Sequence, residues 1–240
     1  MAIFISHRGE SCDAPENTVS AFKLAAKRKT DGIECDIYLT PDRHVVCCHD
    51  ENAYRTSKHD ALVTQTLFDT LRSWDFSNGK KAYLGERIPT LAETLACLKG
   101  DMQIYIEIKK GDVKMVPEML KVIDASGVRL EQITMICFGQ DVCLECKRMR
   151  PALKTLWLTD TRLTAKQLVA ELRKCKADGV DHACFDYVDK EFVSTVKKAG
   201  FYFAVWTVDD AAMAKRFIDA GVDSITSNRA YAVMRELGLK

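Results

Sequence analysis

Short apolar runs and longer amphipathic segments alternate along most of this 240-residue chain. The apolar runs have the length of strands and occupy residues 2–6, 32–39, 102–109, 132–138, 153–158, 180–185, 201–206 and 222–226. Segments with a helical period follow the last six runs, at residues 113–125, 140–149, 164–177, 189–199, 209–219 and 229–237. Helices are expected to end at Gly127, Gly179, Gly200 and Gly221. Eight strand–helix units predict a closed α/β barrel, the TIM (β/α)8 fold, with functional groups at the carboxyl ends of its strands.

The first half of the chain adds two helix starts to this pattern. Asn17 and Thr18 precede an amphipathic stretch, SAFKLAAKR, and can cap a helix there. Thr90 precedes a second helix, expected to extend to about Leu98, and Glu93 stands at the spacing of a capping box. Both helices fit the strand–helix order of the barrel.

A hairpin and an insertion interrupt the repeat. The few residues between Thr40 and His44 include Pro41 and Asp42, too few for the helix that joins parallel strands. Residues 44–48 are therefore expected to return antiparallel to the second strand. Residues 51–87 lose the pattern except for a weak helical period near 67–74, and we interpret them as a small insertion, a lid or specificity element within a single domain over 1–240.

Composition excludes several classes of function. The chain is 47% hydrophobic and 29% charged with a formal net charge of +1, which leaves no basic surface expected for nucleic acid or anionic membranes. No run approaches the roughly 20 apolar residues of a membrane-spanning helix. The first residues resemble a strand rather than a signal peptide, and the ten cysteines are scattered through predicted elements. We expect a cytoplasmic protein with reduced thiols and no stable membrane association.

Two carboxylates share one face of the second predicted strand. Glu34 and Asp36 are two residues apart among apolar neighbours, and such a pair repels unless a cation or a shared proton compensates. The predicted hairpin brings His49 back toward their level, and Glu107 lies near the end of the third strand. Three carboxylates form a hard oxygen site that suits Ca²⁺, Mg²⁺ or Mn²⁺.

Basic and titratable side chains gather at the same predicted mouth. His7 and Arg8 follow the first strand, and Lys109 lies two residues beyond Glu107. Arginine and lysine beside a metal site suit a bound phosphate, and two histidines beside that phosphate can serve as general acid and base. The combination with His49 predicts metal-assisted cleavage of a phosphodiester.

Several of these residues also have a plainer interpretation. Arg8 and Lys109 can serve as salt-bridge partners of the carboxylates inside the barrel. Asn17 either contacts the substrate or only caps its helix, and Trp206, at the end of the seventh strand, either stacks on the substrate or packs. Lys109 could instead form a Schiff base, but the nearby Glu107 opposes the lowered pKa that this chemistry needs.

The order of short motifs resembles a known family. The chain carries, in sequence, His7-Arg8-Gly9, Pro15-Glu16-Asn17-Thr18, Glu34-x-Asp36 with Thr40 and Asp42, His49-Asp50, Pro89-Thr90-Leu91-x-Glu93, Glu107-x-Lys109 and Trp206-Thr207-Val208. These motifs are similar to those of the glycerophosphodiester phosphodiesterase family. The resemblance covers essentially the whole chain and implies a barrel that splits a glycerophosphodiester into sn-glycerol 3-phosphate and an alcohol such as choline or ethanolamine.

The resemblance also implies roles for individual residues. It makes Glu34, Asp36 and Glu107 the ligands of a divalent cation, His7 and His49 the acid/base pair, and Arg8 and Lys109 phosphate contacts. The last strand ends in Ser227-Asn228-Arg229-Ala230, where members often have Thr-Asp-x-Pro. Cys137-Phe138 likewise replaces a common Ser-Phe. We expect neither departure to touch the metal or acid/base groups and expect both to alter substrate preference.

Two other functions stay open. A related phosphodiesterase could act on lysophospholipids or phosphoinositides, for which the insertion offers aromatic residues. A non-catalytic metal- or phosphate-binding barrel would not need two histidines. Attack on phosphorus by a vicinal substrate hydroxyl, giving a cyclic intermediate, and direct attack by water both remain compatible with His7 and His49.

Overall fold

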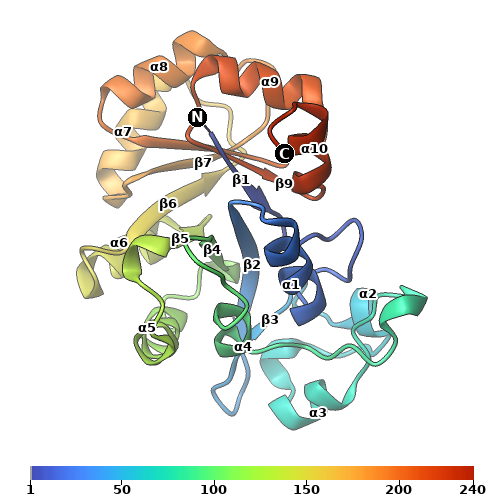
Figure 1. Ribbon diagram of the computed structural model, residues 1–240. Coiled ribbons are helices and arrows are strands. Elements are labelled where there is room, and N and C mark those ends of the chain that lie inside the picture. The colour runs from blue at the N-terminus through green and yellow to red at the C-terminus, as the bar shows by residue number, and fades with distance from the viewer. Residues whose placement is uncertain (1) are drawn as a thin grey trace.

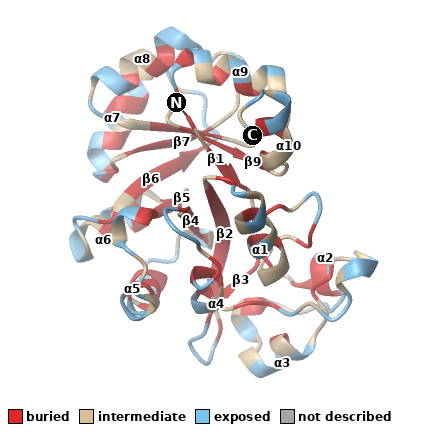
Figure 2. Cartoon of the chain, viewed as in Figure 1, coloured by how far each residue is buried: buried red, intermediate tan, exposed pale blue. Residues whose placement is uncertain are grey.

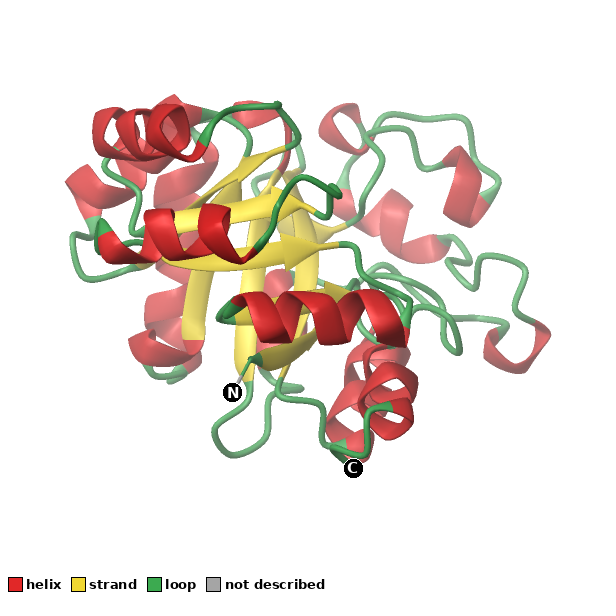
Figure 3. Ribbon diagram, turned by 90° about the horizontal axis from the view of Figure 1, so that it is seen from above, coloured by secondary structure: helices red, strands yellow, loops and turns green. Residues whose placement is uncertain are grey.

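The computed structural model describes residues 2–240, and within them eight parallel strands close a ring that helices surround (Figures 1 and 3). The ring consists of β1 (Ile3–Ser6), β2 (Gly32–Leu39), β4 (Gln103–Ile108), β5 (Ile133–Cys137), β6 (Lys154–Thr159), β7 (Gly179–Ala183), β8 (Tyr202–Trp206) and β9 (Ser224–Ser227). β1 pairs with both β9 and β2, which closes the sheet. The predicted TIM barrel is confirmed.

Helices follow the strands as the amphipathic pattern predicts. They are α1 (Val19–Arg28), α4 (Leu91–Leu95), α5 (Met115–Ser126), α6 (Gln140–Met149), α7 (Ala165–Cys175), α8 (Lys190–Lys198), α9 (Ala211–Ala220) and α10 (Ala230–Glu236), with 3-10 turns η3 (Lys109–Gly111) and η4 (Leu130–Gln132) before α5 and β5. The Thr18 side chain accepts from the Ala21 N–H at the start of α1, and Thr90 with Glu93 forms the predicted capping box of α4. Sequence signals for helix starts were therefore reliable here.

One predicted helix end is wrong. Gly127 and Gly221 cap α5 and α9 in the left-handed conformation, but α7 ends at Cys175 with Lys176 as its cap, and Gly179 is the first residue of β7. A Cβ atom on Gly179 would lie 2.2 Å from the backbone oxygen of Tyr202. This glycine is thus required by the close approach of β7 and β8, and not by a helix terminus.

The predicted hairpin is present. β3 (Val45–Cys47) pairs antiparallel with β2, outside the ring, and its last residue, Cys47, lies opposite Ile37. The Cys48 N–H donates to the Asp36 carbonyl oxygen. Because the chain runs back along β2, His49 returns to the level of the strand between Glu34 and Asp36.

The insertion 51–87 packs against this hairpin (Figure 1). It contains α2 (Tyr54–Ser57), η1 (Val63–Gln65), α3 (Phe68–Ser73), which matches the weak helical period near 67–74, and η2 (Lys81–Tyr83). Its buried apolar side chains join those of the hairpin in one cluster, made of Tyr38, Val46, Cys48, Ala53, Val63, Leu71, Phe76 and Ile88. The insertion is therefore fixed to the segment that carries His49.

Most of the hydrophobic core lies between the sheet and the helices, and the strands are buried along nearly their whole length (Figure 2). A second set of apolar side chains fills the barrel interior: Ile5, Tyr105, Ile136, Leu156, Leu158 and Ala204. The Tyr105 hydroxyl donates to Ser224 Oγ at 3.0 Å within this interior. No helix in residues 2–240 has both the length and the apolar character needed to cross a membrane.

Candidate active site

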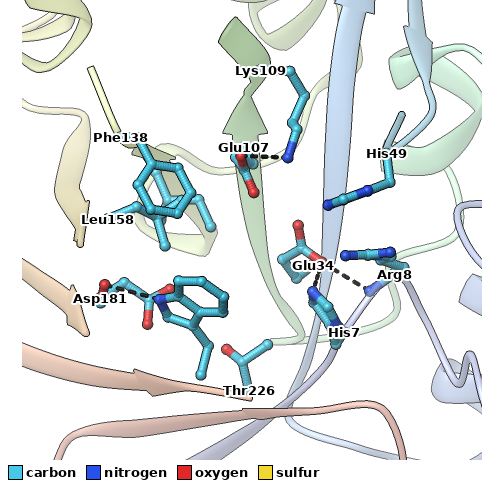
Figure 4. Close-up of a pocket in the computed structure, with 12 residues that line it drawn as sticks. His7, Arg8, Glu34, His49, Glu107, Lys109, Phe138, Leu158, Asp181 and Thr226 are labelled. Atoms are coloured by element: carbon cyan, nitrogen blue, oxygen red, sulfur yellow. Dashed lines mark hydrogen bonds and ion pairs between the residues drawn. The ribbon is translucent and has the colours of Figure 1, made fainter. Parts of the chain in front are cut away.

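A cavity of about 180 Å³ opens at the carboxyl ends of the barrel strands. Its lining combines a charged side with an apolar side and consists of His7, Arg8, Glu34, His49, Glu107, Lys109, Ile136, Phe138, Leu158, Asp181, Trp206 and Thr226. In Figure 4, Phe138, Leu158 and Asp181 lie across the cavity from His7, Arg8 and His49. Most residues predicted for the site from sequence therefore meet at one place.

Three carboxylates form the centre of the charged side. Asp36 on β2 pairs in register with Glu107 on β4, and Glu34 lies two residues before Asp36 on the same face of β2. One oxygen from each of the three lies within 4.8 Å of the others. Glu34 and Asp36 are 2% and 0% exposed, and Glu34 Oε1 and Asp36 Oδ1 have no hydrogen-bond partner among residues 2–240.

Burial and mutual repulsion set the charge of this cluster. They raise the pKa of Glu34 well above its usual range, and burial together with the Asp36 carboxylate raises the pKa of Glu107 to about 8. Burial opposes ionisation of Asp36 too, but Lys109 and Arg8 outweigh it and lower the pKa of Asp36 to about 2. Two of the three carboxylates thus resist ionisation because they are buried close together. Such a cluster of buried carboxylate oxygens fits a hard divalent cation such as Ca²⁺, Mg²⁺ or Mn²⁺.

Arg8 and Lys109 lie on either side of Asp36. Lys109 Nζ lies 2.8 Å from Glu107 Oε1 and 3.4 Å from Asp36 Oδ1. Arg8 Nε lies 3.4 Å from Asp36 Oδ2, and the backbone N–H of Arg8 donates to Glu34 Oε2 at 2.8 Å. Both cations also line the cavity, so the ion pairs inside the barrel leave them beside any bound anion.

A hydrogen-bonded chain holds the His7 ring. Asn228 Nδ2 donates to Asp209 Oδ2 at 2.7 Å, and the backbone N–H of Asn228 donates to Asp209 Oδ1 at 2.8 Å. This orientation leaves Asn228 Oδ1 as the acceptor for His7 Nδ1–H at 2.7 Å. His7 Nε2 then lies 3.8 Å from Glu34 Oε2, while burial and the adjacent Arg8 lower the pKa of His7 to about 4.

This contact corrects one expectation. We expected the departure at Ser227-Asn228 not to touch the acid/base groups, and Asn228 in fact bonds directly to His7. The sequence could not indicate it because Asn228 follows β9 and His7 follows β1, which are neighbours only in the closed ring. Asp209 follows β8, and its pairing with Asn228 could be inferred only once the order of the strands in the closed barrel was known.

A second chain supports His49. His49 Nδ1 lies 2.7 Å from Asp50 Oδ1, and Arg55 Nε on α2 donates to Asp50 Oδ2 at 2.5 Å. The same guanidinium bonds both oxygens of Glu16, at 2.6 and 2.7 Å. Glu16 in turn accepts from Arg8 at 2.9 Å. The insertion thus supplies Arg55, which links the supports of His49 and Arg8.

The remaining predicted residues are divided between the two sides. Asn17 Nδ2 donates to Asp36 Oδ2 at 2.7 Å, and Asn17 is not among the described residues that line the cavity, so its contacts serve the carboxylate cluster. Trp206 lines the apolar side, where its ring meets that of Phe138 edge-on at 5.8 Å. Phe138 and Leu158 complete this apolar wall.

The sequence and fold are similar to those of characterised phosphodiesterases. The sequence model of the glycerophosphoryl diester phosphodiesterase family matches residues 7–231. A glycerophosphodiester phosphodiesterase from Caldanaerobacter subterraneus subsp. tengcongensis is 33% identical over 232 residues, covering 94% of this chain and 93% of that protein. One from Bacillus subtilis is 26% identical over 242 residues, covering 93% and 82%. The solved structure of an Oleispira antarctica phosphodiesterase in complex with the product sn-glycerol-3-phosphate has the same fold, with a TM-score of 0.91 at 23% identity over 99% and 97% of the two chains.

Proposed function

The chain belongs to the glycerophosphoryl diester phosphodiesterase family, and on this premise we propose that its cavity hydrolyses glycerophosphodiesters to sn-glycerol 3-phosphate and an alcohol in a metal-dependent reaction. The observation that carries the proposal is that two histidines, two basic side chains, Glu34 and Glu107 line one cavity, and that Asp36 completes a cluster of three buried carboxylates with the two glutamates. The product bound to the neighbour from Oleispira antarctica supports the substrate class.

Glu34, Asp36 and Glu107 would hold the divalent cation. Glu34 Oε1 and Asp36 Oδ1 support this assignment, because they accept no hydrogen bond among residues 2–240 and buried carboxylate oxygens usually accept one. When bound, the cation would supply positive charge that stabilises the charge developing on the phosphoryl oxygens. Asn17 would keep Asp36 in place through their 2.7 Å hydrogen bond.

Arg8 and Lys109 would bind the phosphate of the substrate. Both have carboxylate partners within 3.4 Å that keep them in position at the cavity wall. Burial disfavours the charged form of Lys109, but Asp36 and Glu107 raise its pKa above the usual range, so its ammonium stays charged. Two fixed cations on one side of the cavity would orient the diester relative to both histidines.

His7 would act as the general base and His49 as the general acid. Asn228 Oδ1 accepts from His7 Nδ1–H, which leaves Nε2 of the neutral ring free to accept a proton from the attacking hydroxyl or water. His49 Nδ1 instead lies 2.7 Å from the Asp50 carboxylate, which would orient the ring to donate a proton to the leaving alcohol. The same pair would serve attack by a vicinal hydroxyl and attack by water.

Release of glycerol 3-phosphate from glycerophosphocholine and glycerophosphoethanolamine tests the proposal. Purified protein treated with EDTA should be inactive, and Ca²⁺, Mg²⁺ or Mn²⁺ should restore turnover. His49→Ala should lower kcat by at least about 100-fold, while His44→Ala, at an exposed position outside the cavity, should change kcat little. Full activity in EDTA, or an active His49→Ala variant, would contradict the proposed mechanism.

A further inference from the structure

The cavity contains two buried polar side chains that the proposed mechanism does not use. Asp181 on β7 and Thr226 on β9 line it and are 1% and 2% exposed. Asp181 Oδ1 and Thr226 Oγ1 have no hydrogen-bond partner among residues 2–240. Since buried polar groups are nearly always paired, two such atoms in one cavity point to a ligand that carries hydrogen-bonding groups.

The surroundings of these atoms indicate the chemistry of that ligand. Ile136, Leu158 and Trp206 also line the cavity, and Figure 4 shows Leu158 on the same side as Asp181. The indole N–H of Trp206 donates to the backbone oxygen of Asp181 at 3.1 Å, so it leaves the Asp181 side chain unpartnered. An apolar wall with a few polar atoms suits a small molecule that combines C–H groups with hydroxyls.

The position of the two residues selects one hydroxyl of the substrate. In Figure 4, Asp181 lies across the cavity from Arg8, and Thr226 lies away from Lys109. A phosphate held by the two basic side chains keeps the vicinal hydroxyl of glycerol beside the charged wall. The terminal hydroxyl, one carbon further from phosphorus, can reach the opposite wall.

We propose that Asp181 and Thr226 bind the terminal hydroxyl of the glycerol moiety and thereby determine specificity for glycerophosphodiesters. This inference rests on the proposed function and adds to it the residues that bind the glycerol moiety. The Thr226 hydroxyl can donate a hydrogen bond to the terminal hydroxyl oxygen of the substrate, and a carboxyl oxygen of Asp181 can accept a hydrogen bond from that hydroxyl.

Asp181 has one competing role, as the counter-ion of a cationic alcohol such as choline. That role needs the ionised carboxylate. Burial raises the pKa of Asp181 well above its usual range, which favours the neutral acid. A neutral carboxyl can donate and accept hydrogen bonds, which suits a hydroxyl better than a quaternary ammonium.

The test compares glycerophosphocholine with the phosphocholine ester of propane-1,2-diol, which keeps the vicinal hydroxyl and lacks only the terminal one. Wild type should prefer glycerophosphocholine by about 10- to 100-fold in kcat/KM. Thr226→Val, which keeps the shape, and Asp181→Leu should each lower kcat/KM for glycerophosphocholine by at least about 5-fold and leave the analogue within about 2-fold. Asp181→Asn, which retains a donor and an acceptor, should keep most of the preference.

Two outcomes would overturn the inference. An equal loss on both esters would make Asp181 and Thr226 structural residues only. If Asp181→Leu lowers kcat/KM for both choline esters and leaves that for glycerophosphoethanol unchanged, Asp181 instead binds the cationic alcohol.

A binding measurement separates this inference from the proposed function. Calorimetry with glycerol 3-phosphate and with the phosphate of propane-1,2-diol needs no turnover. Wild type should bind glycerol 3-phosphate at least about 10-fold more tightly than the phosphate of propane-1,2-diol, and Thr226→Val should remove that preference. If this holds but wild type hydrolyses no diester, the hydrolytic function is wrong and the hydroxyl subsite is still supported. Equal binding of both phosphates by wild type would overturn the subsite.

Discussion

At the scale of single residues, the carboxylate cluster that would bind the metal lowers the stability of the metal-free fold. Glu34, Asp36 and Glu107 are buried within 4.8 Å of one another, and their raised or strongly compensated pKa values reflect repulsion that the unfolded chain does not have. A cation that binds only the folded state would relieve the repulsion and stabilise the protein by mass action. The metal-free protein therefore carries a destabilising site.

Glu34→Gln should raise the melting temperature of the metal-free protein by about 2–5 °C. The amide keeps an acceptor for the Arg8 N–H and removes an ionisable group whose charge the cluster resists. The same substitution should reduce the rise in melting temperature that Ca²⁺ or Mg²⁺ causes in wild type. Thermal unfolding in EDTA and with each metal measures both effects.

The control for this substitution is Glu131→Gln, which removes the same charge at an exposed position. It should leave both the melting temperature and its response to metal unchanged. A lower melting temperature of Glu34→Gln in EDTA would mean that the attraction of Arg8 and Lys109 outweighs the repulsion between the carboxylates.

Asn228→Leu should lower kcat by about 10- to 100-fold and change KM less than about 3-fold. The substitution leaves His7 Nδ1–H without its acceptor, so the ring loses the tautomer and orientation that the base requires. Asp209→Ala should act in the same direction with a smaller effect, since it only frees the Asn228 amide. Initial rates over a range of glycerophosphocholine concentrations separate kcat from KM.

Ser11→Ala provides the matched control, because Ser11 Oγ also bonds Asn228 Oδ1, at 3.4 Å, but does not orient it toward His7. Its kcat should stay near that of wild type. An Asn228→Leu variant whose KM rises while its kcat is unchanged would assign Asn228 to substrate binding.

Sequence could identify site residues that form a local pattern, such as Glu34 with Asp36, and not those that stand alone at the end of a strand. Glu34 and Asp36 were recognisable because residues two apart on a strand share a face. Asn228 and Asp181 were not, since each comes from a different strand and gives no local pattern. The role of Asn228 depends on its hydrogen bond to His7, and that of Asp181 on an oxygen without a hydrogen-bond partner, and both are visible only in the packed structure.

At the scale of secondary-structure elements, the hairpin and the insertion act together to build half of the site. The antiparallel return was predictable from the short 40–44 connection. The docking of the insertion was not, because 51–87 has weak periodicity and finds its apolar partners on the hairpin face that carries Tyr38, Val46 and Cys48. Its contribution to the site is Arg55, which bonds Asp50 and Glu16.

Arg55→Met should lower kcat/KM by about 3- to 10-fold, because Asp50 and Glu16 lose the cation that holds them against His49 and Arg8. Arg55→Lys should recover little activity, since one ammonium cannot replace three N–H donors arranged as a fork. Arg129→Met, which breaks an exposed ion pair with Asp101, is the control and should leave kcat/KM unchanged. Wild-type activity in Arg55→Met would leave the insertion with a structural role only.

At the scale of the whole molecule, closure of the barrel limits what the cavity can hold. Below the cavity, Tyr105 bonds Ser224 and Tyr202, and aliphatic side chains fill the remaining interior. A cavity of about 180 Å³ with a filled floor leaves room for a small polyol phosphate. The eight-strand architecture was predictable from the repeat, but the depth of this floor depends on side-chain packing that the repeat does not specify.

This closed floor predicts the outcome for the lysophospholipid alternative. In a lysophosphatidylcholine acylated at the terminal hydroxyl, the acyl chain replaces the group that we assign to Asp181 and Thr226, and it would have to enter the filled interior. A hexanoyl lysophosphatidylcholine below its micelle concentration should therefore have a kcat/KM at least about 100-fold lower than glycerophosphocholine. Comparable turnover of the two esters would contradict this orientation of the substrate and would mean that its glycerol end faces solvent.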